Sequence, residues 1–221
     1  FTICEHLGIE MLSVGADTAG HKMTEIEALV RQDQNIKGIW CVPKHSNPTG
    51  HTYSEATVKR LANLPNLASK DFVLMWDNAY AAHDLDPQTM PLSNIMAHAQ
   101  DAETADQIAL FASTSKITFA GAGLAFCGLS EPMLKGFETF LTPQMIGFDK
   151  VNQLRHARLL KDPNDIARHM TAHRAILAPK FKRVQKKLMP LAETDLATWS
   201  QPGGGYFVSL DLKTASATRV I

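Results

Sequence analysis

Three apolar runs, separated by helical patterns, constrain the fold of this sequence more than any other feature. The runs cover residues 37–42, 72–76 and 108–112, and each has the length and content of a buried strand. Amphipathic helices are predicted at 23–31 and 55–62, the second with Ser54 as N-cap, while 94–107 is a polar helix or a loop. The alternation predicts an α/β fold: a mostly parallel sheet flanked by helices on both sides.

Lys116 follows the third run, within Ser113-Thr114-Ser115-Lys116. It therefore lies at a strand end, where open α/β sheets bind their ligands. A lysine in an apolar, electropositive pocket loses its proton more easily, as an amine that attacks a carbonyl must. Pyridoxal phosphate is the natural carbonyl partner, held as a Schiff base with hydroxyl and NH groups near its phosphate. A solvated surface lysine is the alternative interpretation.

Two further motifs precede this lysine, Ser46-Asn47-Pro48-Thr49-Gly50 and Asp77-Asn78-Ala79-Tyr80. The first is also typical of a turn, and Asp77 of a turn or a helix cap. With the lysine motif, in this order and separation, they resemble the class I aminotransferases of fold type I, which depend on pyridoxal phosphate. The sequence of residues 113–123 is most similar to that of a bacterial aspartate aminotransferase subgroup, which is related to the aminotransferase-like domains of MocR regulators. The resemblance extends from residue 1 to the segment 203–207.

The resemblance implies a role for each motif residue. Lys116 would anchor the cofactor and carry the proton between the substrate α-carbon and C4′. Asp77 would keep the pyridine nitrogen protonated, Asn47 and Tyr80 would bind the 3-oxygen, and Ser113 would bind the phosphate. The segment 203–207 would line the substrate side.

The sequence also departs from the family pattern. Many members carry a phosphate-binding arginine where this chain has Leu124, and the backbone NH groups of 121–123 are our hypothesis for its replacement. Arg219 lies too close to 203–207 to stand for the arginine that binds the substrate carboxylate. The chain starts at Phe1 without an initiator methionine, so we expect a fragment.

The domain prediction places 1–162 in the large cofactor-binding domain and 163–221 in a linker helix and the start of a small α+β domain. We expect a strand at 9–14, helices at 133–140 and 149–160, and a long helix from 163 to about 189 with a kink or break at Pro179. A hairpin or strand entry is expected at 199–211.

Composition narrows the class of protein. The chain is 45% hydrophobic and 20% charged with a formal net charge of zero, and it holds no apolar run of about 20 residues. These values favour a soluble cytoplasmic protein with neither a membrane span nor a nucleic-acid surface. The basic cluster at 180–187 is interpreted as the solvated face of a helix.

The cysteines and histidines predict neither a disulfide nor a metal site. Cys4, Cys41 and Cys127 are predicted to be reduced, the last two as small core residues. His169 and His173 lie four apart, but without a further ligand they predict no metal site.

The favoured function is transfer of an amino group between an amino acid, aspartate first, and a 2-oxo acid such as 2-oxoglutarate, by a homodimer. Lys150 and Arg155 lie where such enzymes can reach the partner's site, although an exposed helix face is the simpler interpretation. A MocR-type ligand-sensing domain and a lyase or decarboxylase of the same fold are the alternatives.

Overall fold

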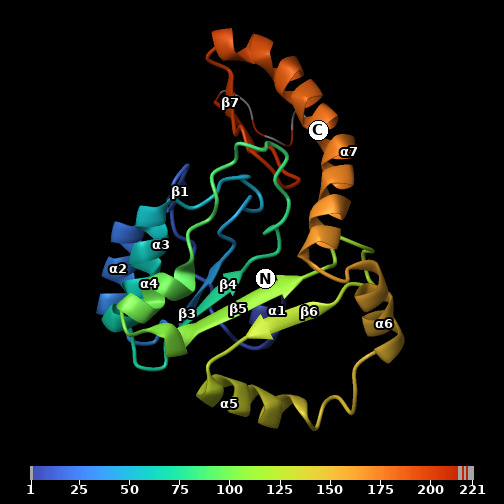
Figure 1. Ribbon diagram of the computed structural model, residues 1–221. Helices are drawn as coiled ribbons and strands as arrows, with labels where there is room; N and C mark the ends of the chain where they lie inside the picture. Colours follow the sequence, from blue (N-terminus) through green and yellow to red (C-terminus); the bar gives the residue numbers. More distant parts are fainter. Residues whose placement is uncertain (1, 214–215, 217, 219–221) are drawn as a thin grey trace.

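The computed structural model describes residues 2–213, 216 and 218 (Figure 1). The α-helices in this part of the chain are α1 (Thr2–His6), α2 (Met23–Gln32), α3 (Glu55–Asn63), α4 (Ile95–Asp101), α5 (Glu131–Leu141), α6 (Lys150–Leu159) and α7 (Pro163–Leu188). The strands are β1 (Ala16–Asp17), β2 (Gly20–His21), β3 (Gly38–Cys41), β4 (Val73–Asp77), β5 (Ile108–Ser113), β6 (Ala125–Gly128), β7 (Ala197–Trp199) and β8 (Leu210–Leu212). Short 3-10 turns lie at Leu64–Leu67, Ala105–Gln107 and Met189–Glu193.

The central sheet has the strand order β3-β4-β5-β6. The three apolar runs form β3, β4 and β5, which pair in parallel, and β6 pairs with β5 in the antiparallel direction. Asp77, the last residue of β4, lies beside Phe111 of β5. The predicted mostly parallel sheet flanked by helices is confirmed.

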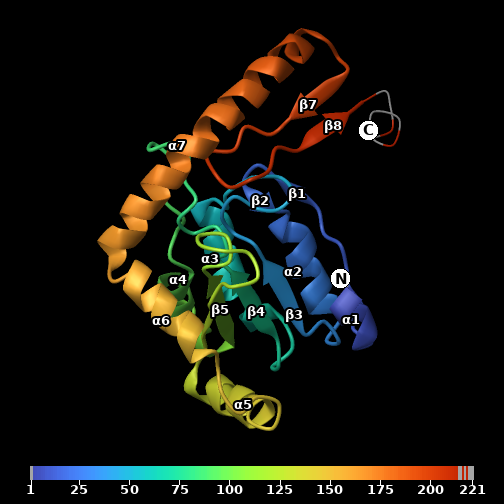
Figure 2. The same ribbon diagram turned by 90° about the vertical axis from the view of Figure 1, so that its right-hand side faces the viewer.

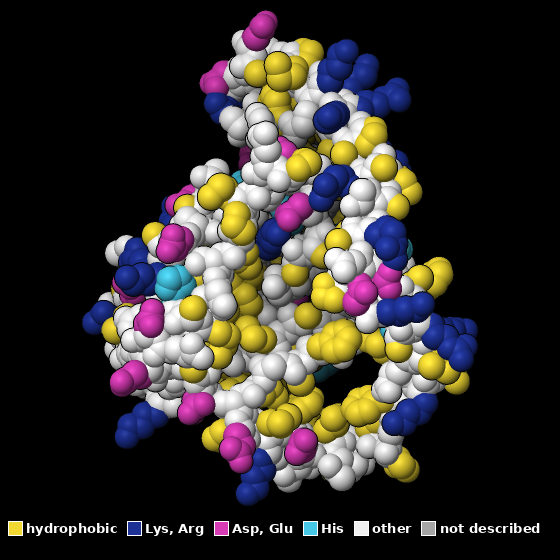
Figure 3. Space-filling view, viewed as in Figure 1, with side chains coloured by type: hydrophobic (Ala, Val, Ile, Leu, Met, Phe, Trp, Pro, Cys, Tyr) yellow, Lys and Arg dark blue, Asp and Glu magenta, His cyan; other side chains and the backbone are white. Residues whose placement is uncertain are grey.

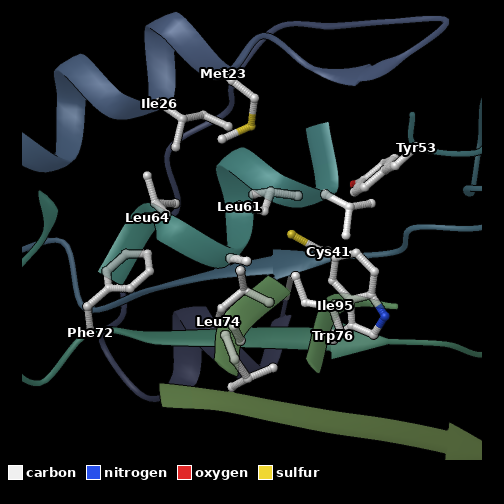
Figure 4. Close-up of a cluster of buried hydrophobic side chains, with 14 of the residues drawn as sticks. Met23, Ile26, Cys41, Tyr53, Leu61, Leu64, Phe72, Leu74, Trp76 and Ile95 are labelled. Carbon is white, nitrogen blue, oxygen red and sulfur yellow. The ribbon is translucent and has the colours of Figure 1, made fainter. Parts of the chain in front are cut away.

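The hydrophobic core lies between one face of this sheet and helices α2, α3 and α4 (Figure 4). Leu74 and Trp76 point from β4 towards Leu61 of α3, while Asp77 alternates to the other face. Helix α3 begins where predicted, because the Ser54 side chain accepts a hydrogen bond from the Thr57 backbone NH at 3.2 Å. Burial of the α2 and α3 apolar stripes fixes both helices against the sheet.

The other face of the sheet carries a stacked aromatic pair. Trp40 of β3 and Phe111 of β5 have ring centroids 6.0 Å apart and planes within 3° of parallel. Trp40 is nevertheless 56% exposed. We expected helices on both faces of the sheet. In the described part of the chain, the helices that pack on the sheet are α2, α3 and α4, and they lie on one face. In the space-filling view, yellow apolar side chains surround a hollow between the sheet and the α5–α6 region (Figure 3).

Two local predictions were wrong. Residues 9–14 form no strand, because a strand needs a hydrogen-bonded partner and none of the described segments pairs with them; Ile9 and Leu12 are exposed. Cys127 is exposed rather than in the core, because its strand β6 lies at the end of the sheet order with all four residues exposed. Cys41 is fully buried, as predicted, and all three cysteines are free.

The later part of the chain follows the predicted helices. Helix α7 is capped by the Asp162 side chain, which accepts from the Asp165 backbone NH at 2.9 Å. It continues through Pro179, so of the kink or break expected there, the break does not occur. Figure 2 shows α7 running from the α6 region to the β7–β8 hairpin, which confirms the predicted hairpin. The basic residues of α7 at 180–187 are exposed, as expected. The domain boundary at 162 stays a prediction, and Arg219 lies outside the described residues.

Candidate functional site

The three sequence motifs all follow parallel strands at one edge of the sheet. Asp77 ends β4 and Ser113 ends β5, while Asn47 lies in the loop that leaves β3. The carboxyl ends of parallel strands lie together, so the sheet delivers these residues to one region of the molecule.

Lys116, Tyr80 and Asp77 are brought together at this edge. The Lys116 ammonium lies 5.0 Å from the centroid of the Tyr80 ring. Tyr80 is only 3% exposed, whereas Lys116 is exposed and Asp77 half-buried. Burial raises the pKa of the Tyr80 phenol, and the negative charge of Asp77 raises it further. The carboxylate therefore acts electrostatically on the ring that lies beneath the amine.

The Asn47 turn reaches this group through the segment 202–207. The turn is closed by the Gly50 backbone NH, which donates to the Ser46 carbonyl at 2.6 Å, and Gly50 has a φ of 75°. A Cβ at Gly50 would lie 2.7 Å from Pro202 Cβ and 3.0 Å from the Phe207 carbonyl oxygen, so the turn packs directly on this segment.

The same segment reaches Tyr80. The centroids of the Tyr206 and Phe207 rings lie 6.1 and 6.2 Å from that of Tyr80. The Asn47 turn and Tyr80 are therefore both in contact with 202–207. The Asn47 side chain itself is exposed and has no hydrogen bond to the described residues.

Helix α6 holds the loop that carries Lys116. His156 Nε2 lies 2.9 Å from both the Thr114 and the Thr118 hydroxyl, and its Nδ1 donates to the Asn152 carbonyl at 2.9 Å. Asn152 Nδ2 donates to the Ala122 carbonyl at 2.9 Å. Because Nδ1 is the donor, Nε2 of the neutral ring accepts the Thr114 hydroxyl, while the Thr118 hydroxyl donates to the Thr114 carbonyl at 3.1 Å. The two α6 side chains thus bind both ends of the loop.

Ser113 lies at the start of that loop. Its hydroxyl oxygen accepts a long hydrogen bond, 3.4 Å, from the Ser115 backbone NH. Leu124, in the place of the family's arginine, has its backbone NH bound to the Thr114 hydroxyl at 2.8 Å. The loop backbone is ordered here by its own threonine rather than by a cationic side chain.

A partly buried ion pair joins the first two motifs. Lys44, just before the Asn47 turn, lies 2.9 Å from the carboxylate of Asp84, just after Tyr80. His45 Nε2 lies 2.8 Å from the same carboxylate. Burial lowers the pKa of His45, against the opposing effect of Asp84. Arg174 of α7 donates to the Asp84 carbonyl at 2.9 Å, so α7 is bound to this junction.

Sequence reasoning missed Lys44, His45, His83 and Asp84. They lie in irregular segments between a strand and a helix, where no periodicity identifies an inward-facing residue. The one signal was their position within a few residues of the two motifs.

A groove of about 680 Å³ adjoins this group. It is lined by Lys44 and Asp84 of the ion pair and by Trp76 among others, but by neither Asp77 nor Lys116. Within the described part of the chain, no three His, Cys, Asp or Glu side chains are placed to hold a metal ion, and no helix is long and apolar enough to cross a bilayer.

The sequence profile of the family described as aspartate amino-transferase matches residues 1–221. The chain belongs to the aspartate aminotransferase family.

Two relatives match this chain along its whole length. A Mycolicibacterium smegmatis protein named as an aminotransferase is 46% identical over 222 residues, covering 100% of this chain and 52% of the relative. An aspartate aminotransferase of Corynebacterium glutamicum is 42% identical over 221 residues, covering 100% of this chain and 51% of that protein. The chain therefore spans about half the length of the curated relatives it matches.

Solved structures of aminotransferases share the fold. An aspartate transaminase from Corynebacterium glutamicum superposes with a TM-score of 0.92 at 41% identity, covering 99% of this chain and 51% of that one. The α-aminoadipate aminotransferase LysN of Thermus thermophilus, solved with N-(5'-phosphopyridoxyl)-L-leucine, gives a TM-score of 0.80 at 21% identity, covering 96% and 52%. The second likeness shows the shared fold alone.

Proposed function

We propose that the intact protein is a pyridoxal-phosphate-dependent aminotransferase that transfers an amino group between aspartate and a 2-oxo acid such as 2-oxoglutarate. The observation that carries the proposal is the Lys116 amine over the Tyr80 ring, beside Asp77, at the carboxyl edge of the sheet. The choice of aspartate is supported by the 42% identity to the Corynebacterium glutamicum aspartate aminotransferase.

The residues present fit this cofactor. The Asp77 carboxylate and the Asn47 amide make no side-chain hydrogen bond or ion pair with the described residues, although Asp77 is half-buried. Both groups therefore have hydrogen-bonding capacity left for a ligand. A carboxylate, an amide, a phenol, a hydroxyl and an amine together match a pyridinium nitrogen, a phenolic oxygen, a phosphate and a carbonyl.

When bound, pyridoxal phosphate supplies an electron sink for the charge left at the substrate α-carbon. Lys116 would hold the cofactor carbonyl carbon, and its Nζ would carry the proton between the α-carbon and C4′. Asp77 would hold a proton on the ring nitrogen by its negative charge. Asn47 and Tyr80 would donate to the 3-oxygen, and Ser113 would donate to the phosphate.

We propose further that the intact protein is a cytoplasmic homodimer acting on small molecules. Family likeness supports the dimer, and the zero net charge argues against a nucleic-acid partner. Lys150 and Arg155 are both exposed on α6 and are therefore accessible to a second subunit. Sedimentation equilibrium tests the dimer, and a monomer at micromolar concentration would contradict it.

The function is tested by reduction with borohydride after incubation with pyridoxal phosphate, followed by peptide mapping. We expect the reduced cofactor on Lys116 and none in Lys116→Ala, while Lys180→Ala, at an exposed position of α7, serves as the matched control. Reduction onto another lysine, or onto none, refutes the proposal.

The reaction is tested by product analysis with aspartate. We expect glutamate to form only when 2-oxoglutarate is present. Release of ammonia or carbon dioxide without a 2-oxo acid would identify a lyase or decarboxylase, and binding without any turnover would favour a ligand-sensing domain.

A further inference from the structure

The backbone carbonyl of Lys116 is held by two side chains from separate segments. His83 Nε2 lies 3.1 Å from this oxygen, and the Tyr206 hydroxyl donates to it at 3.0 Å. A carbonyl oxygen has two lone pairs, so the two donors occupy both. The hydrogen bonds come from the turn after Tyr80 and from the segment 202–207.

The chemistry of the acceptor fixes the tautomer of His83. A carbonyl oxygen accepts only, so the proton of the neutral ring lies on Nε2. The Nδ1 atom is buried and has no hydrogen-bond partner among the described residues, and the side chain is only 2% exposed. Binding the lysine carbonyl is thus the one hydrogen bond that the described structure gives this ring.

The next carbonyl is held in the same way. His169 Nε2, from helix α7, lies 2.7 Å from the Ile117 carbonyl oxygen. The loop also closes on itself, because the backbone NH groups of Ile117 and Thr118 both donate to the Thr114 carbonyl at 2.9 Å. Three side chains from three segments therefore bind two successive peptides at the lysine.

The rings that bind the carbonyl also pack around Tyr80. The His83 centroid lies 5.7 Å from that of Tyr80 and 5.4 Å from that of Tyr206. The Tyr206 hydroxyl lies a further 3.4 Å from His173 Nε2, a long contact to α7. Displacement of Tyr206 would change both the base of the lysine side chain and the ring over which its amine lies.

We propose that His83 and Tyr206 are positioning residues for Lys116, which fix its main chain so that the amine is presented above Tyr80. This rests on the proposed function of Lys116. A lysine side chain has four rotatable bonds, so a fixed Cα is needed to limit where its nitrogen can reach. Small errors in the placement of a reacting group cost rate without weakening substrate binding.

The test compares variants in the rate at which the Lys116–pyridoxal phosphate adduct forms, followed by stopped-flow absorbance, and in kcat and KM. Tyr206→Phe removes only the hydroxyl. We expect adduct formation and kcat to fall about 3- to 10-fold, the effect of one lost hydrogen bond, with KM within about twofold.

His83 offers a rescue pair. Gln places an NH2 group near the position of Nε2 and keeps a donor, whereas Leu keeps the volume without one. We expect His83→Gln to stay within about twofold of the unmodified protein and His83→Leu to fall about tenfold. Tyr53→Phe is the matched control, since it loses a similar hydroxyl contact, 2.7 Å to His21 Nε2, within the core.

The outcomes separate the two proposals. No adduct on Lys116 in the unmodified protein refutes the proposed function and this inference with it. A normal adduct, with Tyr206→Phe indistinguishable from Tyr53→Phe in adduct rate and kcat, overturns the positioning role alone. If His83→Leu fails to fold, the Tyr206→Phe comparison still decides.

Discussion

Lys116 and Tyr80 form a cation–π pair, with the ammonium 5.0 Å from the ring centroid, although 35 positions separate them along the sequence. The pair joins the ends of two adjacent parallel strands, β4 and β5. An aromatic face attracts a cation, so the ring gives a flexible side chain a preferred resting place. Removal of neighbouring charges should change this pair in measurable ways.

Asp77→Asn should lower the pKa of the Tyr80 phenol relative to the unmodified protein. Burial keeps this pKa above its ordinary value of 10.0, but the added effect of the carboxylate is lost. Ultraviolet titration of the phenolate measures the change. We also expect kcat to fall about 100-fold or more, because the charge proposed to face the ring nitrogen is gone. Asp71→Asn, at an exposed position paired with Lys37, should change neither value.

Gly50→Ala should separate the Asn47 turn from the segment 202–207. The new Cβ would lie 2.7 Å from Pro202 Cβ, and φ at this position is 75°. Gly8→Ala is the matched control, with a φ of 68° and open space around the Cβ. We expect Gly50→Ala to lose more than about 1 kcal/mol of stability beyond the control, with weaker cofactor binding. Equal denaturation midpoints for the two variants would contradict the packing described.

Leu61→Ala should destabilise the fold by about 2–5 kcal/mol, because the side chain is fully buried between α3 and the sheet. Urea unfolding followed by circular dichroism measures the loss. Lys59→Ala, exposed on the same helix, should stay within about 0.5 kcal/mol of the unmodified protein. A loss below about 1 kcal/mol for Leu61→Ala would mean that this core is not packed as described.

Stability should fall as pH decreases below about 6.5, the ordinary pKa of histidine. Burial lowers the pKa of His21, His45 and His83, so the unfolded chain binds protons that the folded chain excludes. Above that pH these rings are neutral in both the folded and the unfolded state, so they do not reduce the stability. As the pH falls below it, the rings of the unfolded chain bind protons first, and stability is lost progressively until the lower pKa values of the folded state are passed.

Urea midpoints at about pH 7.5 and about pH 5 check this dependence. His83→Gln should reduce the difference between the two midpoints by removing one of the buried rings. His6→Gln, at the exposed end of α1, should leave it unchanged. An equal or higher midpoint at the lower pH would refute the assignment.

The helices and strands that were predicted correctly are those whose pattern lies within the segment itself. The strand predicted at 37–42 is free of polar side chains from Gly38 onward, and those predicted at 72–76 and 108–112 are apolar throughout. Helix α3 has both an apolar period and a capping Ser54. The motif residues Asp77 and Ser113 could be placed at the sheet edge because they directly follow such runs.

The remaining features depend on partners that a local pattern does not contain. Residues 9–14 are mostly apolar and resemble a strand in sequence, but without a paired segment they stay irregular. Cys127 lies in an apolar run, yet its exposure depends on what covers β6. The hydrogen bonds from His83 and Tyr206 end on a backbone carbonyl, and such an acceptor leaves no trace in the identity of the residue it belongs to.

The parallel pairing of β3, β4 and β5 also has a consequence for how the chain reaches this structure. Gly38 pairs with Val73 and Leu74 with Ile108, so each ladder closes only after a long intervening segment has been confined. The entropy of that confinement is lost before the contacts compensate for it, which slows folding. Dilution from denaturant should therefore give an early helical signal and a later change in the fluorescence of the buried Trp76, and aggregation should compete during the interval between them.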